Sequence, residues 1–104
     1  MSIEENGKKL PQEFIFHEDP GHAWLEVPLH TLELLGISKM ITSFSYKSRG
    51  KAYLEEDVDA LTFIKAWLVS QQRPENDFTY FKARCTTAYE HHSFIRNLPG
   101  YASK

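Results

Sequence analysis

Histidine and carboxylate side chains are concentrated at residues 17–22, which read HEDPGH. His17, Glu18, Asp19 and His22 surround an Asp-Pro-Gly turn signal. Imidazole and carboxylate together suit zinc, manganese or iron better than magnesium or calcium, and they also suit acid/base chemistry. The alternative is a polar hairpin turn in which Asp19 accepts a hydrogen bond. No established metal motif matches this spacing, so both interpretations stay open.

A second acidic cluster comprises Glu55, Glu56 and Asp57, with Asp59 two residues further on. Carboxylates in the first turn of a helix interact favourably with its dipole, by ~0.5–1 kcal/mol each, and Asp57 is a suitable capping residue. The alternative is that one of these carboxylates meets His17 or His22 in space. Such a pair orients an acid or base, or holds a metal.

Aromatic and basic side chains alternate near the C-terminal end of the sequence. Residues 78–101 hold six of the fourteen aromatic residues, interleaved with cations that include Arg84 and Arg96. Stacking combined with positive charge is how proteins hold single-stranded nucleic acid or a nucleotide. Ordinary core packing with exposed basic residues is the alternative, and no RNA-binding signature is present.

Other catalytic patterns are missing from the sequence. It contains no glycine-rich phosphate loop, no G-x-S-x-G elbow and no C-x-x-C pair. Cys85 is the single cysteine, which excludes an intrachain disulfide and a zinc site built on several cysteines. We expect Cys85 to be inert, and we expect no bound metal or cofactor.

Composition is that of an ordinary globular protein. The 104 residues are 41% hydrophobic and 25% charged, with a formal net charge of −2. Residues 1–60 carry six basic and eleven acidic groups, whereas residues 61–104 carry six basic and three acidic groups. A uniformly basic nucleic-acid binder is therefore disfavoured. With no signal-peptide pattern and no apolar run near ~20 residues, we expect a cytoplasmic protein without a membrane partner.

Periodicity predicts the elements that must position these residues. We expect residues 1–12 to be a flexible arm and residues 13–104 to be a single α+β domain. Expected strands are 13–17, 23–27, 40–47 and 51–54, and expected helices are 28–36 and about 55–70. Residues 71–77 read as a loop. Residues 78–84 alternate as in a strand, and helical spacing through Phe81, Cys85, Ala88 and Tyr89 is the alternative. The order predicts a small antiparallel sheet with helices packed on one face.

Two segments carry a resemblance to known proteins. Residues 20–28, PGHAWLEVP, and residues 53–60, YLEEDVDA, resemble small uncharacterised proteins of bacteria, phages and plasmids that share PGHGWL and YLEEDCD patterns. The resemblance spans roughly residues 13–70 and implies no activity. It directs attention to His22 and the Glu55–Asp57 turn, and it implies a mobile-element setting. Ala23 replaces the usual glycine and Val58 the usual cysteine, so the resemblance does not imply cysteine chemistry here.

These features favour a small non-enzymatic module that binds a host protein, with inhibition of a defence system as one such role. Its acidic first half would occupy a basic channel on the target. One alternative is a metal-dependent hydrolase or nucleotide-binding protein. Another is single-stranded nucleic-acid binding through the C-terminal region. Across these hypotheses the candidate site residues are His17, His22, Trp24, Glu55, Glu56, Asp57, Arg84 and Arg96.

Overall fold

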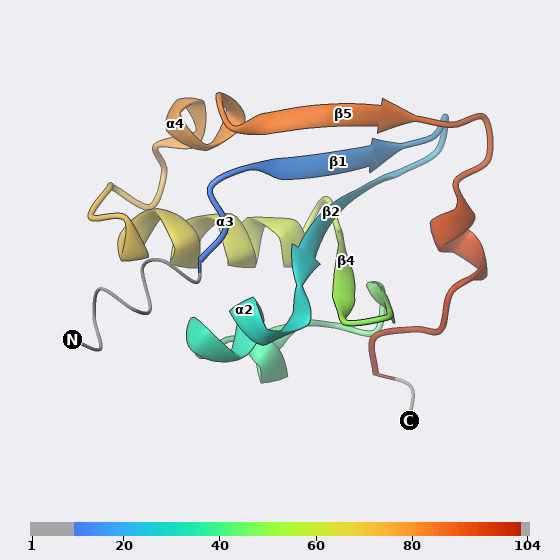
Figure 1. Ribbon diagram of the computed structural model, residues 1–104, viewed down its shortest axis with the longest axis horizontal. Coiled ribbons are helices and arrows are strands. Elements are labelled where there is room, and N and C mark those ends of the chain that lie inside the picture. The colour runs from blue at the N-terminus through green and yellow to red at the C-terminus, as the bar shows by residue number, and fades with distance from the viewer. Residues whose placement is uncertain (1–9, 103–104) are drawn as a thin grey trace.

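A five-stranded sheet organises the molecule, in the order β3-β4-β2-β1-β5 (Figure 1). The computed structural model describes residues 10–102. Its strands are β1 (Phe14–Glu18), β2 (Ala23–Pro28), β3 (Tyr46–Ser48), β4 (Lys51–Glu55) and β5 (Cys85–Tyr89). Neighbouring strands are antiparallel except β1 and β5, which are parallel. The predicted α+β class is confirmed, with a sheet that is mostly rather than wholly antiparallel.

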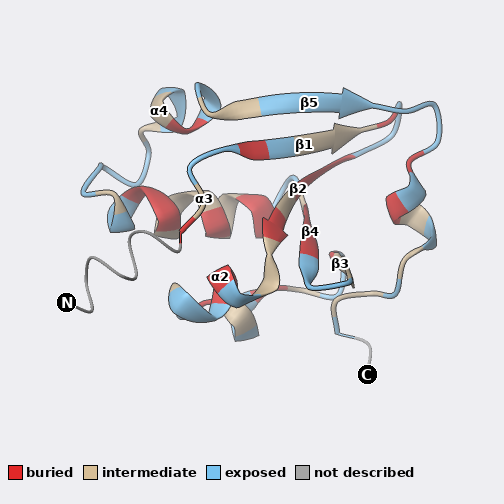
Figure 2. Ribbon diagram, in the orientation of Figure 1, coloured by how far each residue is buried: buried red, intermediate tan, exposed pale blue. Residues whose placement is uncertain are grey.

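Helices cover one face of the sheet. They are α2 (Leu29–Leu34), α3 (Asp59–Ser70) and α4 (Phe78–Lys82), with short 3-10 turns η1 (Ser38–Met40) and η2 (Phe94–Asn97). The main core joins Leu25 and Leu54 of the sheet to Phe63 and Trp67 of α3. Buried residues of α3 recur at positions 60, 63, 67 and 68, which is the spacing of one helix face (Figure 2).

The C-terminal segment covers part of the opposite face. Side chains alternate between the faces of a strand, so Trp24 and Tyr53 point away from the helices. Ile95 of η2 packs against both, with Tyr46 and Leu98 at the margin. The sheet therefore has a large aromatic core on the helical side and a small second cluster under residues 93–98.

The first hairpin and the short helix follow the predicted pattern. β1 and β2 pair across the turn at residues 19–22, with His17 opposite Trp24. α2 ends where Gly36 adopts a φ of +74°, a conformation that glycine reaches without steric cost. β4 lies where it was predicted, and α3 ends at Ser70 as predicted but begins at Asp59, four residues after the predicted start, because residues 56–58 form a turn.

The predicted strand at residues 40–47 is wrong for most of its length. Residues 38–40 form η1, residues 41–45 form an irregular loop, and only Tyr46–Ser48 pair with β4. The cause is Asp59, whose buried carboxylate accepts hydrogen bonds from the Thr42 backbone N–H and from the Thr42 and Ser45 hydroxyls. These bonds hold the loop on the start of α3 in place of a strand ladder.

Residues 78–89 resolve an ambiguity in the sequence. Neither alternative holds throughout. Phe78–Lys82 form the short helix α4 where a strand was one possibility, and Cys85–Tyr89 form a strand where helical spacing was the other. This strand is β5, which pairs parallel to β1 and was not predicted. Phe81 is the buried residue of α4 and its ring lies 4.7 Å from that of Phe14.

The predicted flexible arm is packed at its described end. Leu10 is buried, and the Pro11 carbonyl accepts a hydrogen bond of 2.9 Å from the Trp67 indole N–H. Residues 1–9 of the predicted arm lie outside the described residues. Among residues 10–102, helices fall short of the length and apolarity needed to cross a membrane.

Candidate functional site

Residues 20–28 and 53–60 lie side by side where β2 begins and β4 ends. Trp24 is directly opposite Glu55 in the strand register. Oε1 of Glu56 accepts a hydrogen bond of 3.1 Å from the Ala23 backbone N–H. Because antiparallel pairing brings the start of β2 to the end of β4, two sequence-distant patterns form one local surface.

A cavity of about 390 Å³ opens on this surface, and we call it the aromatic pocket. Its lining residues are His22, Trp24, Phe44, Tyr46, Glu55, Asp57, Val58 and Arg96. Five of these eight were singled out from the sequence. The Trp24 ring is only 3% exposed and lies 5.8 Å from the His22 ring and 6.3 Å from the Tyr46 ring, measured between centroids.

Asp19 holds the turn beside the pocket. Its Oδ1 accepts hydrogen bonds from the Gly21 and His22 backbone N–H groups, as the polar-turn interpretation predicted. Arg96 donates to both carboxylate oxygens, at 2.6 and 2.8 Å. A Cβ at Gly21 would lie 2.8 Å from the Arg96 guanidinium, so glycine lets the cation reach the turn.

This ion pair sets the charge at the back of the pocket. The bidentate contact from Arg96 holds the pKa of Asp19 far below its usual range, although burial acts in the opposite direction. The Ser93 backbone N–H adds a further hydrogen bond to Oδ2. The same contact raises the pKa of Arg96. Asp19 therefore compensates the positive charge of Arg96. The guanidinium also lies over the Trp24 ring, with 5.4 Å between its carbon and the ring centroid.

Glu55 closes the turn at the mouth of the pocket. Its carboxylate accepts hydrogen bonds from the backbone N–H groups of Asp57 and Val58, at 2.8 and 3.0 Å. The expectation that Asp57 caps α3 is wrong, because the cap position is Val58 and no side chain bonds there. Asp57 remains exposed at the rim.

His17 is directly opposite Trp24 on the non-helical face of the sheet, but it does not line the aromatic pocket. Its Nε2 is 2.7 Å from Glu26 Oε1, and Lys51 contacts the other oxygen of Glu26 at 2.7 Å. Burial raises the pKa of Glu26, but the hydrogen bonds from Lys51 and His17 outweigh it and lower the pKa. The rings of Tyr53 and Phe94 flank His17 edge-on. His17 is thus part of a structural ion-pair group.

Arg84 and Cys85 lie where β5 begins, and β1 separates that edge strand from β2. The Arg84 guanidinium stacks on the Tyr80 ring at 3.8 Å and donates to the Tyr80 carbonyl. Burial raises the pKa of Cys85 to about 11, so its thiol is protonated at neutral pH, as expected of an inert cysteine. Arg84 and Arg96 therefore do not form a common basic site.

The metal hypothesis required His17, His22, Glu56 and Asp57 to converge. The structure gives them separate surroundings: His17 pairs with Glu26, Glu56 bonds the Ala23 N–H, and only His22 and Asp57 line the aromatic pocket. Across residues 10–102, no three side chains of His, Cys, Asp or Glu lie together as metal ligands would.

Sequence analysis missed three residues that line the pocket. Phe44 and Tyr46 were noted only as members of an expected strand, and Val58 only as a departure from a pattern. Phe44 is 70% exposed and Val58 is 51% exposed, and the two line the same pocket. An aromatic residue between small polar ones at positions 42–45 was the available signal.

Comparisons with protein-family models, with curated proteins and with solved structures found no match for this chain.

Proposed function

We propose that this protein is a small protein-binding module that docks its partner on the aromatic pocket. One observation carries the proposal: exposed Phe44 and Val58 flank a cavity that also contains Trp24 and two carboxylates. Apolar and aromatic side chains beside a polar rim are typical of the energetic centre of protein interfaces. The opening is also of a size to receive one or two partner side chains.

Charge at the pocket favours a basic partner segment. Glu55 and Asp57 contribute carboxyl groups, whereas Arg96, the one Lys or Arg among residues 10–102 that lines the pocket, is paired with Asp19. A phosphate or carboxylate entering the pocket would meet two like charges. A lysine or arginine side chain would meet two carboxylates and aromatic ring faces, which attract cations.

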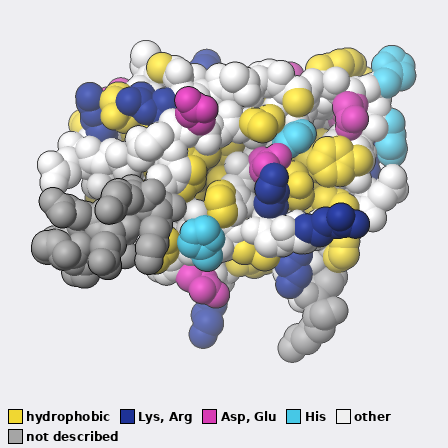
Figure 3. Space-filling model, viewed as in Figure 1, with side chains coloured by type: hydrophobic (Ala, Val, Ile, Leu, Met, Phe, Trp, Pro, Cys, Tyr) yellow, Lys and Arg dark blue, Asp and Glu magenta, His cyan; other side chains and the backbone are white. Residues whose placement is uncertain are grey.

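The face of the molecule shown in Figure 3 does not favour a nucleic-acid partner. Acidic, basic, histidine and apolar side chains are interspersed on that face, and no single basic patch dominates it. A nucleic-acid-binding surface needs clustered cations. Arg84 and Arg96 lie on different elements, and Arg96 is paired with Asp19. This arrangement does not favour a phosphate clamp or a nucleotide site.

The resemblance of residues 20–28 and 53–60 to phage and plasmid proteins, together with the acidic first half of the sequence, supports a host partner in the cytoplasm, including a defence protein with a basic channel. An acidic pocket suits such a target, because opposite charges accelerate encounter and fix orientation.

Affinity capture with paired variants tests the proposal. Wild-type protein should recover one host polypeptide from lysate at low salt. Phe44→Ser and Asp57→Lys should each reduce that recovery at least tenfold, the second through charge reversal. Both side chains are exposed, so neither change should disturb the fold. A photo-crosslinking residue at position 58 should form an adduct with the same polypeptide.

Val69→Ser is the matched control. Val69 is as exposed as Val58 but lies at the end of α3, outside the pocket. This variant should bind like the wild type. Equal recovery by all variants, or no recovery at low salt, would overturn the proposal.

A further inference from the structure

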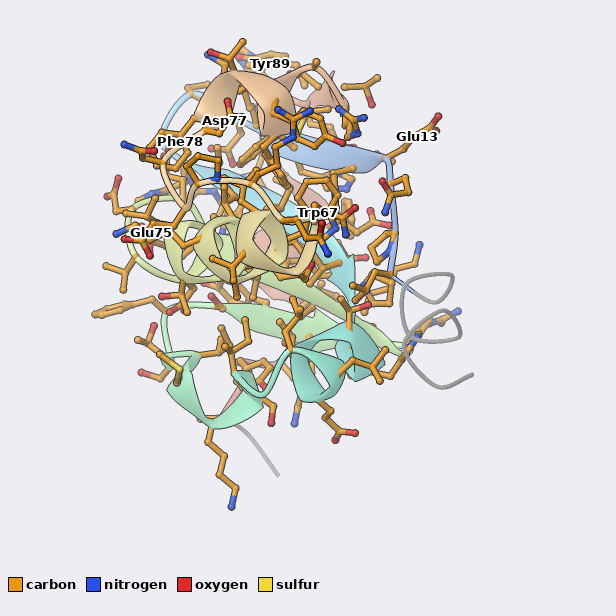
Figure 4. The ribbon with its side chains drawn as sticks, turned by 90° about the vertical axis from the view of Figure 1, so that its left-hand side faces the viewer. Glu13, Trp67, Glu75, Asp77, Phe78 and Tyr89 are labelled. Carbon is orange, nitrogen blue, oxygen red and sulfur yellow. The ribbon has the colours of Figure 1, made fainter. Side chains whose placement is uncertain are left out.

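The outer edge of the sheet at β5 is open. β5 pairs with β1 on one side, and among residues 10–102 no strand pairs with its other side. Residues 86–89 are exposed, and Figure 2 shows β5 in pale blue along most of its length. Figure 4 places Tyr89 at the upper rim of the molecule, away from the core residue Trp67. An open strand edge is a template for another strand.

The hydrogen-bond pattern shows which backbone groups of β5 face outward. Phe14 N–H donates to the Arg84 carbonyl, and Glu90 N–H donates to the Glu18 carbonyl. Because hydrogen-bonding directions alternate along a strand, the even-numbered residues face β1. The N–H and C=O groups of Cys85, Thr87 and Tyr89 therefore point to the open edge.

β5 lacks the features that normally protect such an edge. Its sequence, CTTAY, contains no lysine, no proline and no charged residue, and threonine and tyrosine favour strands. The opposite edge is different, because Tyr46 of β3 forms a bridge with Gly100. Of the two edges described, β5 is the one suited to pairing.

We propose that β5 pairs with β5 of a second copy of this chain, antiparallel and about a two-fold axis at Thr87. In this register Thr87 is opposite Thr87 of the other copy, and Cys85 is opposite Tyr89. All three outward-facing residues then fall at hydrogen-bonded positions, so every open N–H and C=O finds a partner. A two-fold axis makes the interface self-complementary.

Flanking charges select this register. Arg84 precedes β5 and Glu90 follows it, each three residues from Thr87. The two-fold axis therefore places Arg84 of each copy opposite Glu90 of the other, twice in the dimer. Opposite charges at facing positions stabilise strand pairing. Registers centred on Cys85 or Tyr89 lose this match and leave outward-facing backbone groups unpaired.

Pairing at β5 leaves the aromatic pocket free. None of the lining residues of the pocket belongs to β5, and the pocket opens where β2, β4 and η2 meet. The dimer would contain one continuous sheet with β3 at both ends. Self-association and partner binding are thus independent properties, and failure of one does not affect the other.

Sedimentation equilibrium on the purified full chain tests the dimer. The weight-average mass should rise with concentration toward twice the 12.1 kDa of one chain. Arg84→Glu and Glu90→Arg should each weaken association by about tenfold or more, since each puts like charges opposite one another. The double variant Arg84→Glu/Glu90→Arg should restore it. Each single substitution also removes a contact within its own chain, and the double variant does not restore that contact. Recovery of association in the double variant therefore reports on pairing between copies.

Cysteine crosslinking reads out the register. In a Cys85→Ser background, Thr87→Cys should form a disulfide-linked dimer on mild oxidation, because facing Cα atoms lie roughly 5.5 Å apart. Thr86→Cys is the control: its two copies would be offset by two residues, roughly 7 Å along the strands, and should not crosslink efficiently. A wild-type mass that stays at 12.1 kDa up to about 1 mM overturns the proposal. The proposal is also overturned if the substitutions at Arg84 and Glu90 leave association unchanged, or if positions 86 and 87 crosslink equally well.

Discussion

Asp19 is the residue on which the surroundings of the aromatic pocket most depend. Its side chain accepts hydrogen bonds from the backbone of Gly21, His22 and Ser93 and from the Arg96 guanidinium. The side chain is 1% exposed, so its negative charge is compensated inside the protein and not by water. One carboxylate therefore joins the β1–β2 turn to the C-terminal segment.

The lowered pKa of Asp19 predicts a specific acid sensitivity. Its pKa in the folded protein lies below that in the unfolded chain, about 3.9, so the stabilisation is complete above that value. It is lost as the pH falls from about 4 toward the folded pKa. Urea unfolding from pH 7 to pH 2 should show wild-type stability decreasing below about pH 4.

Asp19→Asn is the test of that assignment. The variant should be less stable at pH 7, because the amide nitrogen cannot accept from Arg96 or Ser93. Its stability should also depend less on pH below 4. Glu26, whose pKa is also lowered, remains in both proteins and contributes equally. Identical pH profiles for the two proteins would show that Asp19 is not the responsible group.

At the scale of elements, Asp59 decides how the chain between α2 and β4 is arranged. The residue is fully buried at the first turn of α3 and binds both Thr42 and Ser45. The Ser45 hydroxyl accepts in turn from the Glu55 backbone N–H. This network shortens β3 and leaves Phe44 exposed at the pocket.

We expect Asp59→Ala to lower the free energy of unfolding by about 3 kcal/mol, because it leaves buried N–H and O–H donors without an acceptor. Chemical denaturation measures this directly. Asp57→Ala is the control, since Asp57 is exposed, and should change stability by less than about 0.5 kcal/mol. A loss of similar size in both variants would contradict a special role for Asp59.

At the scale of the whole molecule, one sheet joins two apolar clusters of unequal size. Trp67 lies in the large aromatic core with Phe14, Phe63 and Phe81 on the helical side. Trp24 lies in the small cluster with Tyr53 and Ile95 on the other side. Each face therefore contains one of the two tryptophans of the sequence.

This distribution lets fluorescence test whether the faces unfold together. In Trp24→Phe only Trp67 reports, and in Trp67→Phe only Trp24 reports. Each variant should show a single transition that coincides with its loss of circular dichroism, since small domains usually unfold in one cooperative step. If Trp24 emission changes at a lower denaturant concentration than the circular dichroism of the same variant, the C-terminal segment unfolds separately.

Several elements were predictable because their signals are local. Aromatic and branched residues on either side of turn signals predicted β1, β2 and β4, apolar residues at helical spacing predicted α3, and Pro28 with Gly36 delimited α2. Residues 41–45 were mispredicted because their alternation is real, yet a carboxylate fourteen or more residues away competes for their polar groups. Local periodicity contains no information about that contact.

The candidate site divides in the same way. The sequence by itself determined the α+β class and the Asp19 turn, and it identified candidate site residues that include His22, Trp24, Glu55, Asp57 and Arg96. Only the tertiary structure decided that these five share one pocket with Phe44 and Val58, that His17, Glu56 and Arg84 do not line it, and that β5 is an open edge parallel to β1. The physical reason is that residue type and spacing specify what a short segment can form. Strand pairing and the matching of buried charges specify which distant segments meet.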